Sequence, residues 1–234
     1  MVAIHHQVTL GDAKVVLGEW QKMDSSVSVR IDKLRWYVSL PPTKGGENPR
    51  KSAGKTRRSS TRSHGDDLGA KVWLLDLADS SSLDQIYVYP KLAVARDFAI
   101  SLLFGVDSAI QVGGVGKGAL DPQRGMYWTW QTGYVQWKME GAIRVDEESH
   151  RFDGSAGAEY PMELHLGGFD GATKAQAMLS DCLVNSTTNS VIAQWELSPF
   201  IARVLDQKKF GVMSPSPIAR DYCRIIADGV SFHK

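Results

Sequence analysis

Apolar and polar residues alternate along many short stretches of this 234-residue chain. In the stretch 2–10, His6 and the apolar residues Val2, Ile4, Val8 and Leu10 occupy the even positions. In the stretch 135–140, large apolar side chains again occupy every second position. A period of two, carried by aromatic and β-branched residues, is typical of β-strands with one buried face. The pattern therefore predicts a chain built mainly of strands.

One stretch near the C-terminus has a helical pattern instead. Ser216 is suited to cap a helix, Pro217 fits its first turn, and Gly229 fits its end. The apolar stripe between them consists of Ile218, Tyr222, Ile225 and Ile226. We therefore expect a helix over 217–228 that packs on a sheet. The predicted fold is mainly β, an antiparallel β-sandwich with one or two short C-terminal helices, in a single domain over 1–234.

The segment 41–67 interrupts the alternation. It opens with Pro-Pro-Thr-Lys-Gly-Gly and is rich in Lys and Arg, with almost no apolar side chain. Such a segment cannot bury enough surface to offset the entropy of ordering, which predicts a mobile basic loop. Binding of phosphate or acidic lipid is one interpretation, but the lack of aromatic residues favours a solvated insertion.

Composition and charge exclude several classes of protein. The chain has 27 Lys and Arg against 26 Asp and Glu, so its charge gives no argument for a nucleic-acid partner. No apolar run reaches the roughly 18 residues of a membrane span. The first residues contain no export signal, so the protein is either cytoplasmic or exported with its signal removed. Cys182 and Cys223 are able to form one disulfide or to remain two buried thiols.

Common catalytic motifs are missing from the chain. It contains no Gly-x-Ser-x-Gly, His-Glu-x-x-His or Cys-x-x-Cys sequence. The glycine-rich stretch 113–118 has no Ser or Thr after its lysine, so we interpret it as a connector and not as a phosphate loop. The residues alone identify no catalytic centre.

An aromatic block at 125–134 is the densest feature of the sequence. Trp128 and Trp130 have the same parity, which on a strand places them on one face about 7 Å apart. Three interpretations stay open: hydrophobic core, a flat platform for a sugar ring or a base, and an oxidisable pair close to a metal.

Two histidines are candidates for metal binding. His6 shares the apolar parity of its strand, whereas His165 has the opposite parity to Leu164 and Leu166. A hydrogen-bonded core histidine is the more common role for the first, and an ordinary polar-face residue for the second. Imidazoles that converge in space would suit copper or zinc. A bulge or a strand end would have to bring these two together.

Several blocks of the sequence resemble one known family. They are Leu34-Arg-Trp-Tyr-Val-Ser39, Trp73-Leu-Leu-Asp76, Phe104-Gly-Val-Asp107, the block from Gly118 through Met-Tyr-Trp-Thr-Trp-Gln-Thr-Gly-Tyr134, Lys138-Met-Glu-Gly141, His165-Leu-Gly-Gly168 and Val212-Met-Ser-Pro215. Together they are similar to the MbnP-like copper-binding proteins, which are named for the methanobactin operon. The resemblance covers about 1–40 and 70–234.

The resemblance implies an exported protein, periplasmic or on the cell surface. It also implies a partner, a di-haem peroxidase of the MbnH or MauG type, which oxidises a tryptophan to kynurenine. The new amine and carbonyl groups help to hold copper in related proteins, together with two histidines. By the resemblance, His6 matches the first-strand histidine and His165 the His-Leu-Gly motif, while Trp128 and Trp130 match the tryptophan pair. Trp36 remains a further candidate for oxidation.

We therefore expect a copper-binding protein that is not an enzyme, with His6 and His165 as ligands and Trp128 or Trp130 alongside. Two alternatives remain. In the first, the protein is mainly a tryptophan-bearing substrate of the peroxidase and copper is secondary. In the second, it is a non-catalytic binding module that uses the aromatic block as a platform.

Overall fold

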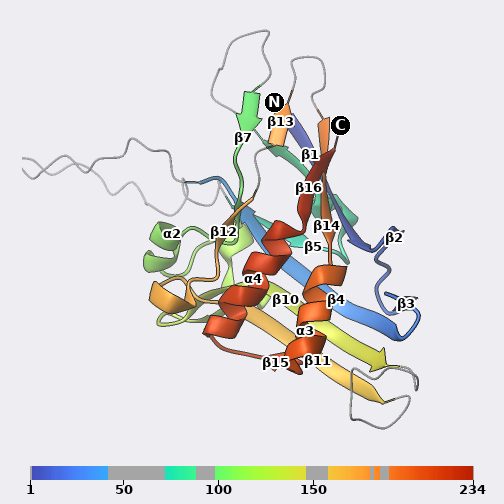
Figure 1. Cartoon of the computed structure of the whole chain (residues 1–234). Helices are drawn as coiled ribbons and strands as arrows, with labels where there is room; N and C mark the ends of the chain where they lie inside the picture. Colours follow the sequence, from blue (N-terminus) through green and yellow to red (C-terminus); the bar gives the residue numbers. More distant parts are fainter. Residues whose placement is uncertain are drawn as a thin grey trace, which may run out of the picture.

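The chain is described by a computed structural model that covers residues 2–41, 72–87, 98–145, 158–179, 182–184 and 190–233. The predicted basic loop 41–67 lies outside this part of the chain, apart from residue 41, so its mobility stays a prediction. The alternating stretches form two β-sheets that pack face to face, which confirms the predicted β-sandwich (Figure 1).

The larger sheet, which we call the β10 sheet, is built from long antiparallel strands. β4 (Val27–Ser39) and β11 (Glu159–Gly167) pair with the two edges of β10 (Gly133–Val145). β5 (Val72–Asp76) pairs with the other edge of β4. Short strands extend this sheet; they are β3 (Trp20–Lys22), β8 (Leu103–Phe104), β9 (Tyr127–Thr129), β12 (Ala177–Met178) and β15 (Gly211–Val212).

The smaller sheet, which we call the β1 sheet, is centred on β1 (Val2–Leu10). Its other strands are β2 (Ala13–Lys14), β6 (Asp84–Tyr87), β14 (Ser190–Glu196) and β16 (Val230–His233). β1 and β14 run parallel, as do β11 and β15, so the sandwich is not antiparallel throughout. A parallel pair needs a long connection, which the sequence separation of β1 and β14 supplies. A separate ribbon joins β7 (Phe98–Ile100) to β13 (Cys182–Val184).

The longer helices lie near the C-terminal end of the chain. α4 (Pro217–Asp228) has the bounds that its sequence pattern predicts, and the backbone N–H of Ala219 donates to the Ser216 hydroxyl over 3.1 Å. The other helical segments are α2 (Ser108–Val112), α3 (Ser198–Gln207), η2 (Ser80–Leu83), η3 (Gly118–Leu120), η4 (Pro122–Arg124) and η5 (Gly171–Thr173). Within the described ranges, none of the helices has the length and apolarity that crossing a bilayer requires.

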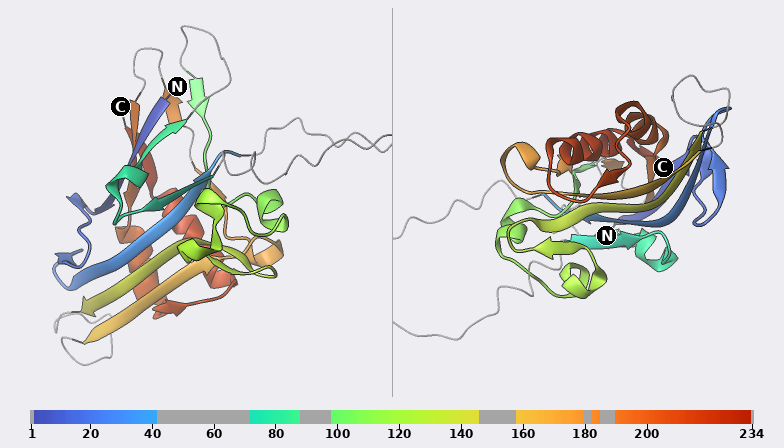
Figure 2. Two further views of the ribbon diagram at one scale, coloured as in Figure 1. Left: turned by 180° about the vertical axis from the view of Figure 1, so that it is seen from behind. Right: turned by 90° about the horizontal axis from the view of Figure 1, so that it is seen from below.

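Three tryptophans join the two sheets. Trp195 of β14 contacts Trp36 of β4 and Trp137 of β10, with ring centroids 5.3 and 6.2 Å apart. All three side chains are fully buried, and each indole removes a large apolar area from water. α3 and α4 lie over the same inner face of the β10 sheet (Figure 2). This inner face is therefore apolar, and polar side chains on the sheet are directed to its outer face.

The pairing of β4 with β10 depends on Gly141, because a Cβ atom there would overlap the carbonyl oxygen of Arg30. We expect Gly141→Ala to lower the free energy of unfolding by about 2–3 kcal/mol, since the two backbones have to separate. Gly211→Ala is the control, because a Cβ at Gly211 meets no atom within 4 Å. Urea unfolding measures both, and an equal loss in the two variants would contradict this account.

Candidate functional site

A row of polar side chains crosses four neighbouring strands on the outer face of the β10 sheet, the face turned away from the buried tryptophans. Strand register places Asp76 of β5 opposite Arg35 of β4. Arg35 lies opposite Lys138 of β10, and Lys138 lies opposite His165 of β11. Side chains directly opposite each other have Cβ atoms about 4.5–5.5 Å apart, so the four form one continuous row. We call it the outer-face row.

Glu140 lies two residues after Lys138 on β10, on the same face. Its carboxylate contacts His165 and two lysines. Its Oε1 lies 3.0 Å from Nε2 of His165 and 3.3 Å from Nζ of Lys138. Its Oε2 accepts from Nζ of Lys33 over 2.8 Å. Partial burial acts to raise the pKa of Glu140, but the hydrogen bonds from Lys33 and His165 and the charge of Lys138 outweigh it and lower the pKa to about 2. Glu140 is therefore an ionised acceptor at neutral pH.

The contact with Glu140 fixes the tautomer of His165. Burial lowers the pKa of His165 despite the opposing effect of its hydrogen bond to Glu140, and the side chain is 12% exposed. A carboxylate only accepts, so the neutral imidazole carries its proton on Nε2 and its lone pair on Nδ1. Metal-binding histidines usually donate their other ring N–H to a carboxylate in this way. His165 is therefore oriented as a ligand would be.

Trp128 lies on the same face, against the position of Gly167 on β11. Gly167 follows His165 by two residues, and a Cβ atom there would lie 2.7 Å from Cζ3 of the Trp128 ring. The glycine thus makes room for the indole, which packs on a small outer cluster. The buried members of this cluster are Tyr37, Val72, Val106, Ile110, Leu120, Met126, Tyr134 and Val135. Trp130 is different, because it lies in the turn after β9 and is 76% exposed.

His6 lies on the inner face of the β1 sheet, where it is 4% exposed. The indole N–H of Trp195 donates to its Nδ1 over 3.1 Å. Burial, together with the charge of His5, lowers the pKa of His6 to about 3. Because an indole N–H only donates, neutral His6 keeps its proton on Nε2. The lone pair that a metal ion would need is already engaged by Trp195.

The structure does not bring His6 and His165 together. His6 faces the core from the β1 sheet, whereas His165 stands on the outer face of the β10 sheet, so the β10 sheet and its buried tryptophans lie between them. A metal ion lies about 2 Å from each ligand nitrogen, so one copper ion cannot bind both in this arrangement. The pairing of β10 does contain register shifts, after Val135 and at Glu140. They do not bring the histidines together, because each histidine stays on the face that its parity in the sequence predicts.

Other metal-binding groups are sparse. Within the described ranges, no group of three or more His, Cys, Asp or Glu side chains is placed to hold a metal ion. Cys223 is a buried free thiol, and burial raises its pKa, so it supplies no thiolate at neutral pH. Of the two predicted states, a disulfide or a buried thiol, Cys223 is therefore in the second.

The family model described as MbnP matches residues 1–210 of the chain. The chain belongs to the MbnP family. A solved structure, MbnP from Methylosinus trichosporium, is 14% identical to it with a TM-score of 0.45, over 86% of this chain and 77% of that one. No curated protein matches the chain. Family membership points to a methanobactin-related protein, and members of this family are associated in operons with other proteins.

Five of the seven sequence blocks that resemble the MbnP family contribute side chains to the outer face of the β10 sheet. Their contributions are Arg35, Asp76, Trp128, Lys138, Glu140 and His165. Nε of Arg35 donates to Oδ2 of Asp76 over 2.7 Å, so the far end of the outer-face row is also fixed by an ion pair. Blocks that lie far apart in the sequence thus form one surface in this MbnP-family chain.

The sequence alone predicts no role for Lys138, Glu140 or Trp195. A signal for the first two was present, because both have the parity opposite to Trp137 within one strand. No local signal indicates that Trp195 lies against His6, since the two strands are adjacent only in the folded chain.

The low pKa of His6 predicts a pH-dependent stability. The unfolded chain protonates this imidazole near its ordinary pKa of 6.5, whereas the folded chain does so near 3. Stability from this residue is therefore complete above pH 6.5 and is lost as the pH falls towards 3. We expect the wild type to lose about 3 kcal/mol more than His6→Gln between about pH 7 and about pH 4.

Urea unfolding at the two pH values measures this difference. His233→Gln is the control, because His233 is an exposed residue at the end of β16. It should lose as much stability on acidification as the wild type. An identical loss in the wild type and His6→Gln would show that His6 is not held neutral by the fold.

Proposed function

We propose that this chain is an exported copper-binding protein, periplasmic or on the cell surface, and not itself an enzyme. The copper site lies on the outer face of the β10 sheet, at His165 beside Trp128. The observation that carries the proposal is the convergence of five of the seven family-like blocks on this one surface. His6, which sits in the core with its lone pair engaged, is not part of this site.

The metal-binding groups present support a copper site that is completed by oxidation of Trp128. His165 offers one imidazole nitrogen, and Glu140 holds it from the other side. An unmodified indole has only a donor N–H and is no ligand. Oxidation of Trp128 to kynurenine would add an amine and a carbonyl beside His165, both suited to a copper ion. Lys33 and Lys138 keep Glu140 ionised and in place.

The geometry favours Trp128 over Trp130 as the oxidised residue. Trp128 is the ring that covers Gly167, on the face of His165, whereas Trp130 projects from the turn. A di-haem peroxidase of the MbnH or MauG type is the proposed catalyst of this oxidation, with hydrogen peroxide as the oxidant. The exposed ring of Trp130 is suited to contact such a partner, and it also keeps the aromatic-platform alternative open.

Mass spectrometry of protein isolated from its native host tests the choice of tryptophan. Conversion to kynurenine removes one ring carbon of the residue, which is released as formate, and adds one oxygen atom. We expect this change in the peptide that contains Trp128 in the wild type and in Trp130→Phe, but not in Trp128→Phe. Modification of Trp130, with Trp128 intact, would contradict the assignment.

Copper titration of the oxidised protein tests the ligand. Because a carboxylate behind a ligating histidine typically contributes 10–100-fold in affinity, we expect Glu140→Gln to weaken copper binding by about that factor. His165→Gln should abolish it. Glu163→Gln is the matched control, since Glu163 lies on the same face but makes no hydrogen bond to His165. Unchanged affinity in His165→Gln would overturn the proposed site.

A further inference from the structure

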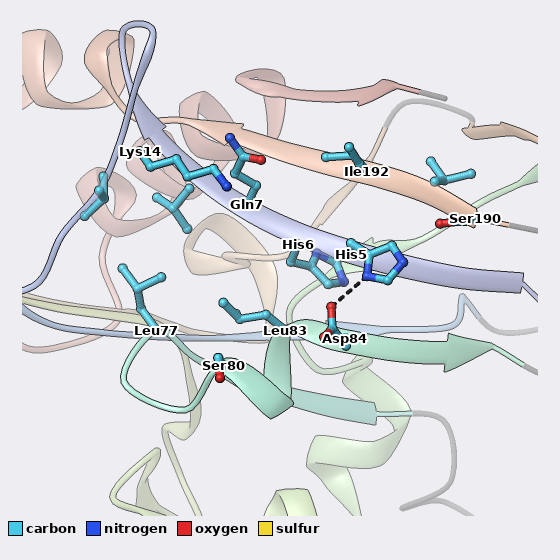
Figure 3. A pocket seen from close by; sticks show the side chains of 13 residues that line it. His5, His6, Gln7, Lys14, Leu77, Ser80, Leu83, Asp84, Ser190 and Ile192 are labelled. Carbon is cyan, nitrogen blue, oxygen red and sulfur yellow. Dashed lines mark hydrogen bonds and ion pairs between the residues drawn. The ribbon is translucent and has the colours of Figure 1, made fainter.

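A pocket opens along the edge of β1, on the sheet that does not carry the proposed copper site. The pairing of β1 with β6 ends at His5, and its pairing with β2 begins at Thr9. Between these two short strands a pocket of about 550 Å³ is left, bordered by the segment of η2 (Figure 3). This volume is within the range of about 300–1,000 Å³ found for small-molecule sites.

Much of the pocket wall is apolar. Its apolar lining residues are Val8, Val15, Leu77, Leu83, Val191 and Ile192. Some of these residues lie on β1 and β14, and the others lie on segments that connect the strands. The apolar part of a bound ligand would therefore be contacted from more than one side. Burial of apolar surface is therefore available to a ligand as a source of affinity.

The polar groups of the pocket are unequally satisfied. The carboxylate of Asp84 is engaged by Nδ1 of His5 over 2.7 Å, as the dashed line in Figure 3 marks. His6 is neutral and bonded to Trp195. Lys14 also lines the pocket, and its ammonium makes no ion pair with any residue in the described ranges. The pocket thus has an unneutralised cation at one end and an internally paired carboxylate at the other.

The hydrogen bonds of His5, His6 and Asp84 argue against a metal ion in this pocket. His6 presents a ring N–H and no lone pair, which leaves His5 and Asp84 as the remaining metal-binding groups. They already bond to each other. A ligand with an anionic end and an apolar body fits these walls better.

We propose that this pocket binds a small amphipathic carboxylic acid. The carboxylate pairs with Lys14, and the apolar body lies against Val8, Leu83 and Ile192. The proposal is independent of the copper site, which lies on the outer face of the other sheet.

Titration with octanoate, followed by the amide and methyl NMR signals of the protein, tests the proposal. Octanol is the matched neutral probe, because it has the same apolar body without the charge. We expect saturable shifts at Val8, Val191 and Ile192 for both probes, with octanoate binding more tightly. Lys14→Gln should weaken octanoate binding by about threefold to fivefold, the contribution typical of a solvent-exposed ion pair, and leave octanol binding unchanged.

Lys22→Gln is the control for loss of a surface charge, since Lys22 is an exposed residue of β3 outside the pocket. It should leave the affinity for octanoate unchanged. Ile192→Glu should abolish octanoate binding, because it places a negative charge at the partly exposed Ile192. The proposal is overturned if octanoate gives no saturable shift up to about 10 mM. It is also overturned if the shifts lie outside the pocket, or if Lys14→Gln and Lys22→Gln behave alike.

Discussion

The register of β5, β4, β10 and β11 is the constraint on which the proposed site depends. Side chains on a strand alternate between two faces, so a slip of one residue in any of these pairings would move part of the outer-face row into the core. Arg35 and Asp76 are joined at one end of the row, and Glu140 ties Lys33, Lys138 and His165 at the other. Apolar burial on the opposite face sets this register, because a slip would also expose Trp137 and Leu164.

The inner face of the same strands shows how strongly packing dominates. Among the residues that the structure describes, none accepts a hydrogen bond from the buried indole N–H of Trp36 or Trp137. An unsatisfied donor costs about 1–3 kcal/mol. Burial of an indole, at about 150–250 Å² each, contributes about 4–6 kcal/mol. The apolar term therefore outweighs the lost hydrogen bonds, and the tryptophans of the core serve to hold the sheets together.

Much of the fold could be predicted because its signals are local. Period-two alternation gave the strands, and Ser216, Pro217 and Gly229 marked the last helix. The parity of His6 and of His165 was also predictable, and both residues face the sides that parity assigns. The sequence of a single strand does not indicate which other strand it pairs with. The parallel pairing of β1 with β14, and the contact of Trp195 with His6, arise from segments at opposite ends of the chain.

The candidate site shows the same division. Parity alone placed Trp128 and Trp130 on one face, but β9 ends at Thr129, so strand geometry no longer applies to Trp130. Lys138, Glu140 and His165 each have the parity of an outer face, yet only strand pairing shows that they meet. The blocks that resemble the family contain most of these residues but do not indicate where they lie in the fold. The resemblance and the strand pairing together identify the outer face of the β10 sheet as the candidate site.

The position of a bound copper ion tests this account most directly. Crystals of the oxidised protein with copper, measured on both sides of the copper absorption edge, would locate the metal by its anomalous scattering. The account predicts a peak on the outer face of the β10 sheet, within bonding distance of a ring nitrogen of His165 and next to residue 128. A copper peak in the pocket of His5 and His6, with none at His165, would contradict it.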